Sequence, residues 1–212
     1  MSINKYSDVV TEIKNWSFRN DLTDEQIGQF VYLTGNLANQ FLRVPPMENT
    51  VLLQVHDGNR VEIPNDYLEL RSLTAPWNSY FGKPLEYVSW DQFVNHNNET
   101  LGTGEETLYY SRQGPYWFVS ADLGEDATLT CHYYRSMPDI SPTEQTNWLV
   151  DMSPAAYLFG GLHFLYLFVM DTERSEYWLT KFQGEVIRIQ ALSDKAEHSG
   201  TRLAIRNKSI GG

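Results

Sequence analysis

The side chains of this 212-residue chain that are best suited to chemistry are its histidines and its single cysteine. The histidines show no C-x-x-C, H-E-x-x-H or other metal-ligand spacing; they are His56, His96, His132, His163 and His198. Cys131 adjoins His132, and a thiol beside an imidazole can act as a nucleophile. Neighbouring residues of a strand point to opposite faces, however, so we expect these two side chains not to meet. His163 lies in an apolar stretch and is expected to be a hydrogen-bonded core or interface residue.

Carboxylates and aromatic rings could together form a sugar site. Acidic residues gather at Glu105-Glu106, at Asp122 and at Glu125-Asp126. A glycosidase needs two carboxylates across one cleft, which the sequence cannot place, and charged turns are the default explanation. The rings at Tyr109-Tyr110 and Tyr116 to Phe118 could stack on sugars, although a sheet core or a protein interface is the more ordinary role. Walker, G-x-S-x-G and complete G-x-G-x-x-G motifs are absent from the sequence. We predict no catalytic residue, no metal and no cofactor.

The overall charge argues against a general nucleic-acid binder. The chain has a formal net charge of -11 and a pI near 4.8, so its surface as a whole should repel phosphates. One cysteine cannot form an internal disulfide, and the first ten residues lack the apolar core of a signal peptide. We expect synthesis and folding in a reducing cytoplasm.

The C-terminal segment departs from this acidic character. Residues 193–212 carry four cations against two acids, a net charge of +2, and show no periodic apolar pattern. Two interpretations stay open: a disordered terminus, or a basic arm that orders only on a partner.

Two amphipathic helices are predicted at the start of the chain. Apolar residues at three- and four-residue spacing predict the first helix over Asn4 to Trp16. Thr23 and Gln26 form a capping box that begins the second helix, whose apolar face extends to Phe41. Pro45-Pro46 ends this helical stretch.

An apolar helix lies near the other end of the chain. Ser153 is placed to cap it and Pro154 takes its first position, and the apolar stretch extends to Met170. This stretch is apolar on every face, which predicts a buried helix, and it is short for a membrane span. Gly160-Gly161 indicate close approach of another backbone or a kink, with packing inside the subunit favoured over a subunit seam. Asp171 is expected to cap a last helix that ends near Leu192.

The middle of the chain has the pattern of a small antiparallel sheet. A hairpin is signalled by Asp57-Gly58, and a short helix with Ser89 as its cap is expected at Ser89 to Asn95. The predicted strands are 51–55, 60–63, 66–73, 108–110, 116–119 and 128–134.

These elements together predict an α+β fold: a four-helix bundle with an inserted small antiparallel β domain and an extended C-terminal arm. Residues 1–45 and 142–192 form the discontinuous bundle, 46–141 the insert and 193–212 the arm.

Several stretches resemble, in this order, the head-to-tail adaptor (connector) proteins of tailed bacteriophages, including the group called tail tubular protein A. Each is weakly specific alone, and their order and spacing carry the resemblance. They are Asp21 to Ile27, Arg43 with Met47-Glu48, Ile63 to Glu69, Arg71 to Leu73, Pro84 to Val88, Tyr133-Tyr134, Pro138 to Ser141, Thr146 to Leu149, Pro154 and Tyr157 to Leu162.

The resemblance implies a structural virion protein without catalysis, assembled in the host cytoplasm. Such adaptors form a ring of twelve copies beneath the portal, link the DNA-filled head to the tail nozzle or tail tube, and line a channel through which DNA passes without sequence-specific binding. The C-terminal arm would dock on the portal, and Arg202, Arg206 and Lys208 would suit that role. The alternatives are a virion-associated module that binds or hydrolyses polysaccharide or peptidoglycan through the β insert, and an unrelated cytoplasmic dimer.

Overall fold

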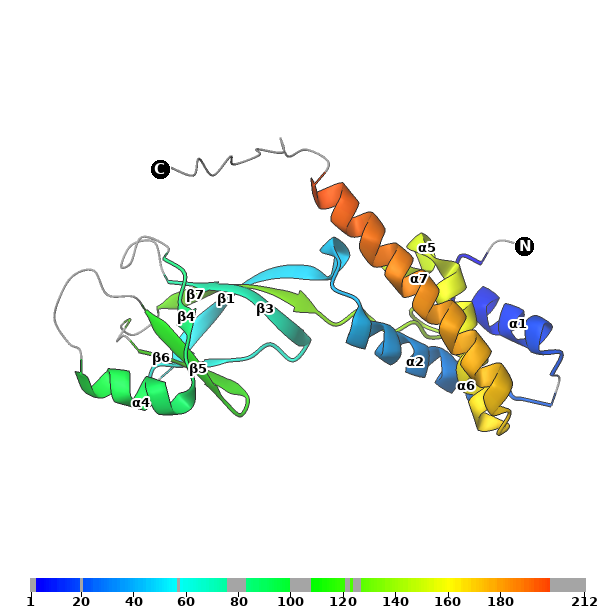
Figure 1. Ribbon diagram of the computed structural model, residues 1–212, viewed down its shortest axis with the longest axis horizontal. Coiled ribbons are helices and arrows are strands. Elements are labelled where there is room, and N and C mark those ends of the chain that lie inside the picture. Colours follow the sequence, from blue (N-terminus) through cyan, green and yellow to red (C-terminus); the bar gives the residue numbers. More distant parts are fainter. Residues whose placement is uncertain are drawn as a thin grey trace, which may run out of the picture. The chain divides into compact units, whose positions relative to one another are not determined.

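The computed structural model has an α+β fold and describes residues 3–19, 21–56, 58–75, 83–99, 108–120, 123 and 127–198. The chain divides into two compact units, each with its own core (Figure 1). One unit contains Met1–Pro46 and Met137–Gly212 and is helical; the other contains Met47–Ser136 and holds the sheet.

The described part of the helical unit contains five α-helices, and the nearly all-apolar one lies at their centre. Helix α6 packs against each of the other four, so almost every face of it is covered. The helices are α1 (Tyr6–Ser17), α2 (Asp24–Phe41), α5 (Trp148–Met152), α6 (Pro154–Phe168) and α7 (Thr172–His198). No helix in the described ranges is both long enough and apolar enough to cross a bilayer.

The predicted four-helix bundle is not confirmed in that form. A short fifth helix, α5, precedes α6, and Asn147 caps it by accepting hydrogen bonds from the backbone N–H groups of Leu149 and Val150, both at 3.1 Å. Five residues are too few to show a helical period, which is why the sequence pattern does not reveal α5. Helix α7 is also longer than predicted and continues past Leu192 to His198.

Three of the four predicted helix caps are confirmed. Thr23 and Gln26 form the capping box of α2. Asp171 accepts the backbone N–H of Arg174 at 3.1 Å at the start of α7, and Ser89 precedes α4 (Trp90–Glu99) as its cap.

The prediction that the Ser153 side chain caps α6 is wrong. Its hydroxyl makes no cap hydrogen bond, and it donates instead to Oε2 of Glu185 on α7 at 2.8 Å. Ser153 also ends α5, and its ψ of 79° departs from the extended backbone that a cap residue usually adopts. Pro154 does occupy the first turn of α6, as predicted.

The glycine pair of α6 serves packing inside the helical unit, the interpretation that the sequence favoured. A Cβ on Gly160 would overlap Thr34 of α2, and one on Gly161 would overlap Ile13 of α1. Thr34 and Ile13 are fully buried. The two glycines therefore allow two helices to approach α6 closely from different sides.

The second unit is built on a curled seven-stranded sheet with the order β3-β7-β1-β2-β6-β5-β4. Neighbouring strands are antiparallel except β4 and β5, which are parallel. The strands are β1 (Glu48–His56), β2 (Arg60–Glu62), β3 (Tyr67–Thr74), β4 (Glu86–Tyr87), β5 (Tyr109–Gln113), β6 (Tyr116–Val119) and β7 (Thr128–Arg135). The predicted β1–β2 hairpin is confirmed, with Gly58 and Asn59 at φ of 78° and 54° in its turn.

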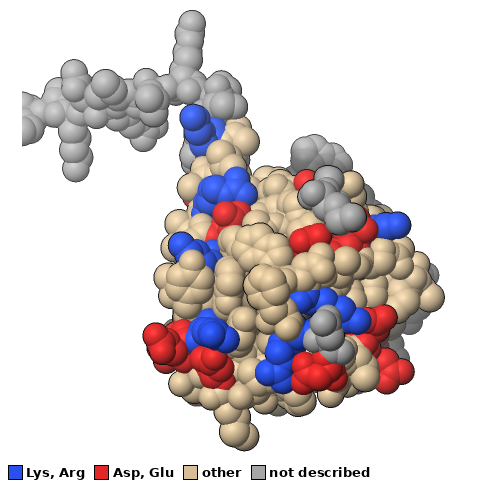
Figure 2. All heavy atoms as spheres, turned by 90° about the vertical axis from the view of Figure 1, so that its right-hand side faces the viewer, with Lys and Arg blue, Asp and Glu red and all other residues tan. Residues whose placement is uncertain are grey.

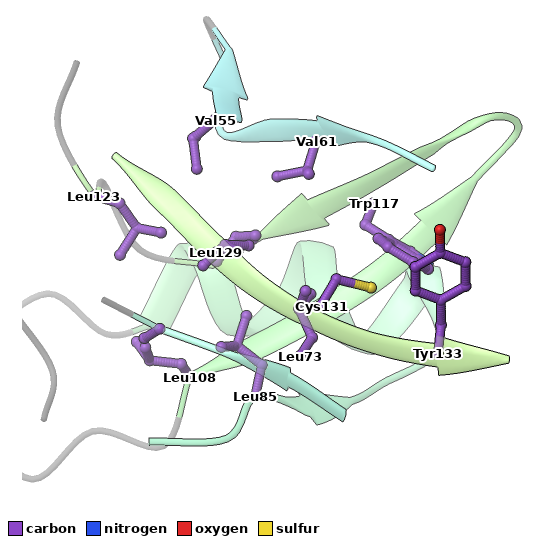
Figure 3. Close-up of a cluster of buried hydrophobic side chains, with 12 residues drawn as sticks. Val55, Val61, Leu73, Leu85, Leu108, Trp117, Leu123, Leu129, Cys131 and Tyr133 are labelled. Atoms are coloured by element: carbon purple, nitrogen blue, oxygen red, sulfur yellow. The ribbon is translucent and has the colours of Figure 1, made fainter. Parts of the chain in front are cut away.

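The curled sheet encloses an apolar core of its own. Side chains from most of its strands point into one interior, where Leu129, Cys131 and Val61 are fully buried (Figure 3). Trp117 and Tyr133 fill one part of this core, and each is at most 2% exposed. Helix α4 packs against β5. Because all members of this cluster lie within Met47–Ser136, the sheet unit has the apolar burial that an independent domain needs.

Candidate interaction surfaces

The predicted portal-docking residues lie outside the described part of the chain. Arg202, Arg206 and Lys208 follow His198, the last described residue. The first part of the predicted arm is helical, since α7 includes Ser193, which is 9% exposed.

Cys131, His132 and His163, three of the candidate groups, lie in structural surroundings. Burial raises the pKa of the Cys131 thiol to about 12, while the His132 ring is on the other side of β7, with Nδ1 2.8 Å from the Thr50 hydroxyl. His163 Nδ1 lies 2.9 Å from the Ser175 hydroxyl and so ties α6 to α7. In the described ranges, no three His, Cys, Asp or Glu side chains are grouped as a metal site requires.

The rings of the sheet belong mainly to its core. Trp117 is 1% exposed and lies between Tyr67 and Tyr110, with ring centroids 5.3 and 6.4 Å away. Phe118 packs edge-on against Trp90 of α4 at 5.3 Å. Strand β6 therefore does not present the row of exposed rings that a sugar-binding platform needs. The acidic residues considered for catalysis, Glu105, Glu106, Asp122, Glu125 and Asp126, lie outside the described residues.

An aromatic cluster on the helical unit, called here the ring cluster, is partly open to solvent. Trp16 of α1 lies 6.4 Å from Phe159 of α6 and 5.8 Å from Trp178 of α7, between ring centroids. Tyr177 adjoins Trp178 at 5.0 Å, and the Lys181 ammonium lies 5.3 Å above the Tyr177 ring. Trp16 is 47% exposed and Tyr177 54% exposed. Half-exposed rings of this kind are typical anchors of protein interfaces.

Two large apolar residues project from helix ends in a backbone conformation that disfavours them. Phe18, after α1, has a φ of 53°, and Met170, after α6, has a φ of 59°. They are 90% and 88% exposed. Left-handed backbone costs a non-glycine residue roughly 1 kcal/mol. A left-handed residue commonly ends a helix, and their exposure makes these two side chains candidate contacts for a partner.

Several charges on the described helical surface are paired locally. The side chains of Arg19 and Asp21 lie 2.7 Å apart and those of Arg188 and Glu185 lie 2.6 Å apart. Figure 2 shows Lys and Arg interspersed with Asp and Glu, between broad uncharged areas. No single sign of charge dominates this face.

The helical unit also carries a groove, called here the tyrosine groove, made of two adjoining hollows that share Tyr6, Glu25 and Pro142. The hollow along α1 and the start of α2 has a volume of about 540 Å³. The hollow beside Tyr32 and Asp139 has a volume of about 470 Å³. The backbone N–H of Tyr6 donates to the carbonyl of Gln145 at 2.6 Å, which fixes one wall of the groove.

Two carboxylates of the groove have no ion-pair partner among the described residues. They belong to Glu25 and Asp139, whereas the neighbouring Asp24 pairs with Lys14. Partial burial raises the pKa of Asp139, and burial followed by the charge of Asp24 raises the pKa of Tyr6. The groove thus offers negative charge beside aromatic rings.

Sequence reasoning missed the tyrosine groove, although one signal for it was present. Gly28 lies in the interior of α2, where glycine weakens a helix. A Cβ at this position would overlap the hydroxyl of Tyr6. A glycine inside a helical pattern often marks such a close approach.

The model of the family described as SU10 adaptor protein matches residues 4–206. The matched region covers nearly the whole chain, spans both units, and includes Arg202 and Arg206. No curated protein matches the sequence.

Proposed function

This chain belongs to the SU10 adaptor protein family, a family of phage head-to-tail adaptors, and on that premise we propose that it forms a ring beneath the portal and links the DNA-filled head to the tail. It is a structural phage protein. The family match over residues 4–206 is the observation that carries the proposal. The proposed partners are the portal above the ring and a tail nozzle or tail tube protein below it, with assembly in the host cytoplasm.

A cyclic ring needs two different and complementary faces on every subunit. The ring cluster around Trp16 and Tyr177 and the exposed helix ends at Phe18 and Met170 supply apolar anchors for such contacts. Twelve copies, as in the tail tubular protein A group, is the proposed stoichiometry. The helical unit would be the bundle that builds the ring, with the sheet unit as its insert.

The charge of the chain suits a channel that DNA traverses. A net charge of -11 weakens attraction to phosphates, so DNA would slide past the wall without being held and without being read in sequence. The basic segment with Arg202, Arg206 and Lys208 is the proposed exception, since it would dock on the portal.

Portal docking is tested by mixing the purified chain with portal rings and imaging the product. The full chain should add a ring of density to the portal. A variant that ends after His198 keeps the whole of α7 and should fold, as judged by circular dichroism, but should fail to bind.

A full-length variant with Arg202, Arg206 and Lys208 changed to Gln provides the matched control, since it keeps the length of the segment and removes its charge. Loss of binding in both variants supports docking through these cations. Equal binding by the full chain and both variants would remove the arm from the mechanism, and no added ring with the full chain would contradict the adaptor proposal itself.

A further inference from the structure

The tyrosine groove has the chemistry to hold a basic, partly apolar segment. Tyr6 and Tyr32 provide rings, and Glu25 and Asp139 provide carboxylates that no described cation neutralises. Rings beside carboxylates suit Arg and Lys, which can pair with the acids and lie against the ring faces. Ile140 and Pro142 add an apolar lining.

One segment of the chain has the complementary composition. Residues 199–212 contain Arg202, Arg206 and Lys208, no acidic residue, and the apolar residues Leu203, Ile205 and Ile210. The rest of the chain is strongly acidic, so this segment is its most evident source of matching charge. We infer that in the free chain residues 199–212 dock in the tyrosine groove of their own helical unit, with the cations at Glu25 and Asp139.

The segment is long enough to turn back along α7 toward the part of the helical unit that contains the groove. The hydrogen bond between Ser153 and Glu185 places the second half of α7 beside the α5–α6 junction, a few residues after Gln145 of the groove wall. From Glu185 to His198 the helix rises roughly 20 Å, at 1.5 Å per residue. Lys208, the last cation, lies ten residues past His198, and ten extended residues span up to roughly 33 Å, so the chain can turn back over that distance.

This inference does not rest on portal docking, but the two are connected. If the groove and the portal bind the same cations, a chain whose arm is held in its groove must release that arm before docking. Nucleic acid is a poor occupant, because the uncompensated carboxylates would repel phosphates. Cross-links within one chain, as opposed to links between two chains, distinguish the chain's own arm from the arm of a second copy.

The first test places a photo-cross-linker at a groove position of the full chain. Replacing Tyr32, which is 50% exposed, by p-benzoylphenylalanine should give cross-links to residues 199–212 in a product of monomer mass. The same cross-linker at Tyr177, equally open but part of the ring cluster, should give few such links. Links that join two chains, or equal yields from positions 32 and 177, would overturn the inference.

The second test measures how fast trypsin cleaves the full chain after Arg202, Arg206 and Lys208, read by mass spectrometry. Glu25→Gln combined with Asp139→Asn removes both charges without adding a trypsin site. Cleavage should become about three- to tenfold faster, as the loss of two partly exposed ion pairs implies. Raising the salt concentration should speed cleavage of the unaltered chain in the same direction.

The matched control is Glu173→Gln combined with Glu176→Gln, which removes two exposed acids of α7 away from the groove. This variant should be cleaved at the rate of the unaltered chain. Equally faster cleavage in both double variants would show that net charge, rather than the groove, controls the access of trypsin to the segment. Unchanged cleavage in both would show that Glu25 and Asp139 do not hold the segment. Failure of portal binding with protection intact would count against the proposed function alone.

Discussion

At the scale of single residues, Gly160 shows how little room the centre of the helical unit leaves. The overlapping atoms belong to Thr34, whose hydroxyl donates to the carbonyl of Phe30 at 2.8 Å and is therefore held in place. The helices α2 and α6 can approach this closely only because position 160 has no side chain.

Gly160→Ala should destabilise the protein by about 1–3 kcal/mol, because an added methyl group in a packed interior forces neighbours to move. Gly184→Ala is the matched control: it also lies in a helix, but nothing surrounds its missing Cβ within 4 Å. That change should stabilise the chain by up to about 1 kcal/mol through helix propensity. Denaturant unfolding of both variants tests these opposite expectations. Equal shifts of the unfolding midpoint in Gly160→Ala and Gly184→Ala would contradict the close packing at position 160.

Substitution of Phe18 and Met170 can test whether these side chains contribute to ring assembly without contributing to the stability of the chain. Replacing both by Gly removes two exposed apolar side chains and suits the left-handed backbone, while raising the entropy of the unfolded chain. The free energy of unfolding should change by less than about 1 kcal/mol. If these residues anchor the ring, assembly on portal rings should nevertheless be weakened, as seen by imaging. Full assembly by the double variant would exclude them as anchors.

At the scale of elements, helix α7 is fixed to the rest of its unit by polar contacts at two positions in its second half. Glu185 accepts from Ser153 at 2.8 Å and from Arg188 at 2.6 Å. Further along, Gln190 donates to the carbonyl of Arg43, just after α2, at 3.0 Å. The hydrogen bond from Arg188, with a further one from Ser153, lowers the pKa of Glu185 although burial opposes the shift.

The contribution of Glu185 to stability should depend on pH. Because its pKa is lower in the folded chain, the stabilisation is complete above the ordinary carboxyl range and is lost as pH falls through the folded-state pKa. Glu185→Gln should cost about 1 kcal/mol at pH 7, and the difference from the unaltered chain should shrink between roughly pH 5 and pH 3. Melting temperatures of the Glu185→Gln variant and of the unaltered chain, measured across this pH range, test the expected pH dependence. Ser153→Ala should add less in the Glu185→Gln background than alone, and strict additivity would contradict the coupling.

Elements with a clear local signal were predicted, and those formed by tertiary contact were not. The capping box at Thr23 indicates the start of α2, and the turn residue Gly58 indicates the β1–β2 hairpin. Strand β4 has only two residues and exists because it pairs with β5, so its own sequence carries no period. The Ser153 hydroxyl bonds to Glu185, a distant residue that no local pattern reveals. The tyrosine groove was missed for the same reason, since α1, α2 and the segment near Pro142 meet only in the fold.

At the scale of the whole molecule, each unit has its own buried core, and the sheet unit begins and ends at adjacent points. Glu48 and Tyr134, close to the two places where the chain enters and leaves, are register partners in the β1–β7 ladder. A unit with neighbouring ends is suited to insertion, because it need not distort the helices between which it is inserted.

The fragment 47–136 should therefore fold alone. It contains the whole cluster around Leu129 and Trp117, so it should show one cooperative unfolding transition and the near-ultraviolet circular dichroism of packed rings. Leu129→Ala should lower its stability by about 2–5 kcal/mol, whereas Leu52→Ala, at a 69% exposed position of β1, should have little effect. A fragment without a cooperative transition would show that the sheet unit depends on the helices.

The pairing of β1 with β7 also has a mechanical consequence. The two strands leave the sheet unit from the same end, at Glu48 and Arg135, and the seven register pairs between Glu48 and Gln54 tie them along their length. A pull that separates the sheet unit from the helices would load both strands in the same direction, so their ladder would not be sheared. Two tethers in parallel share tension and resist torque better than a single linker.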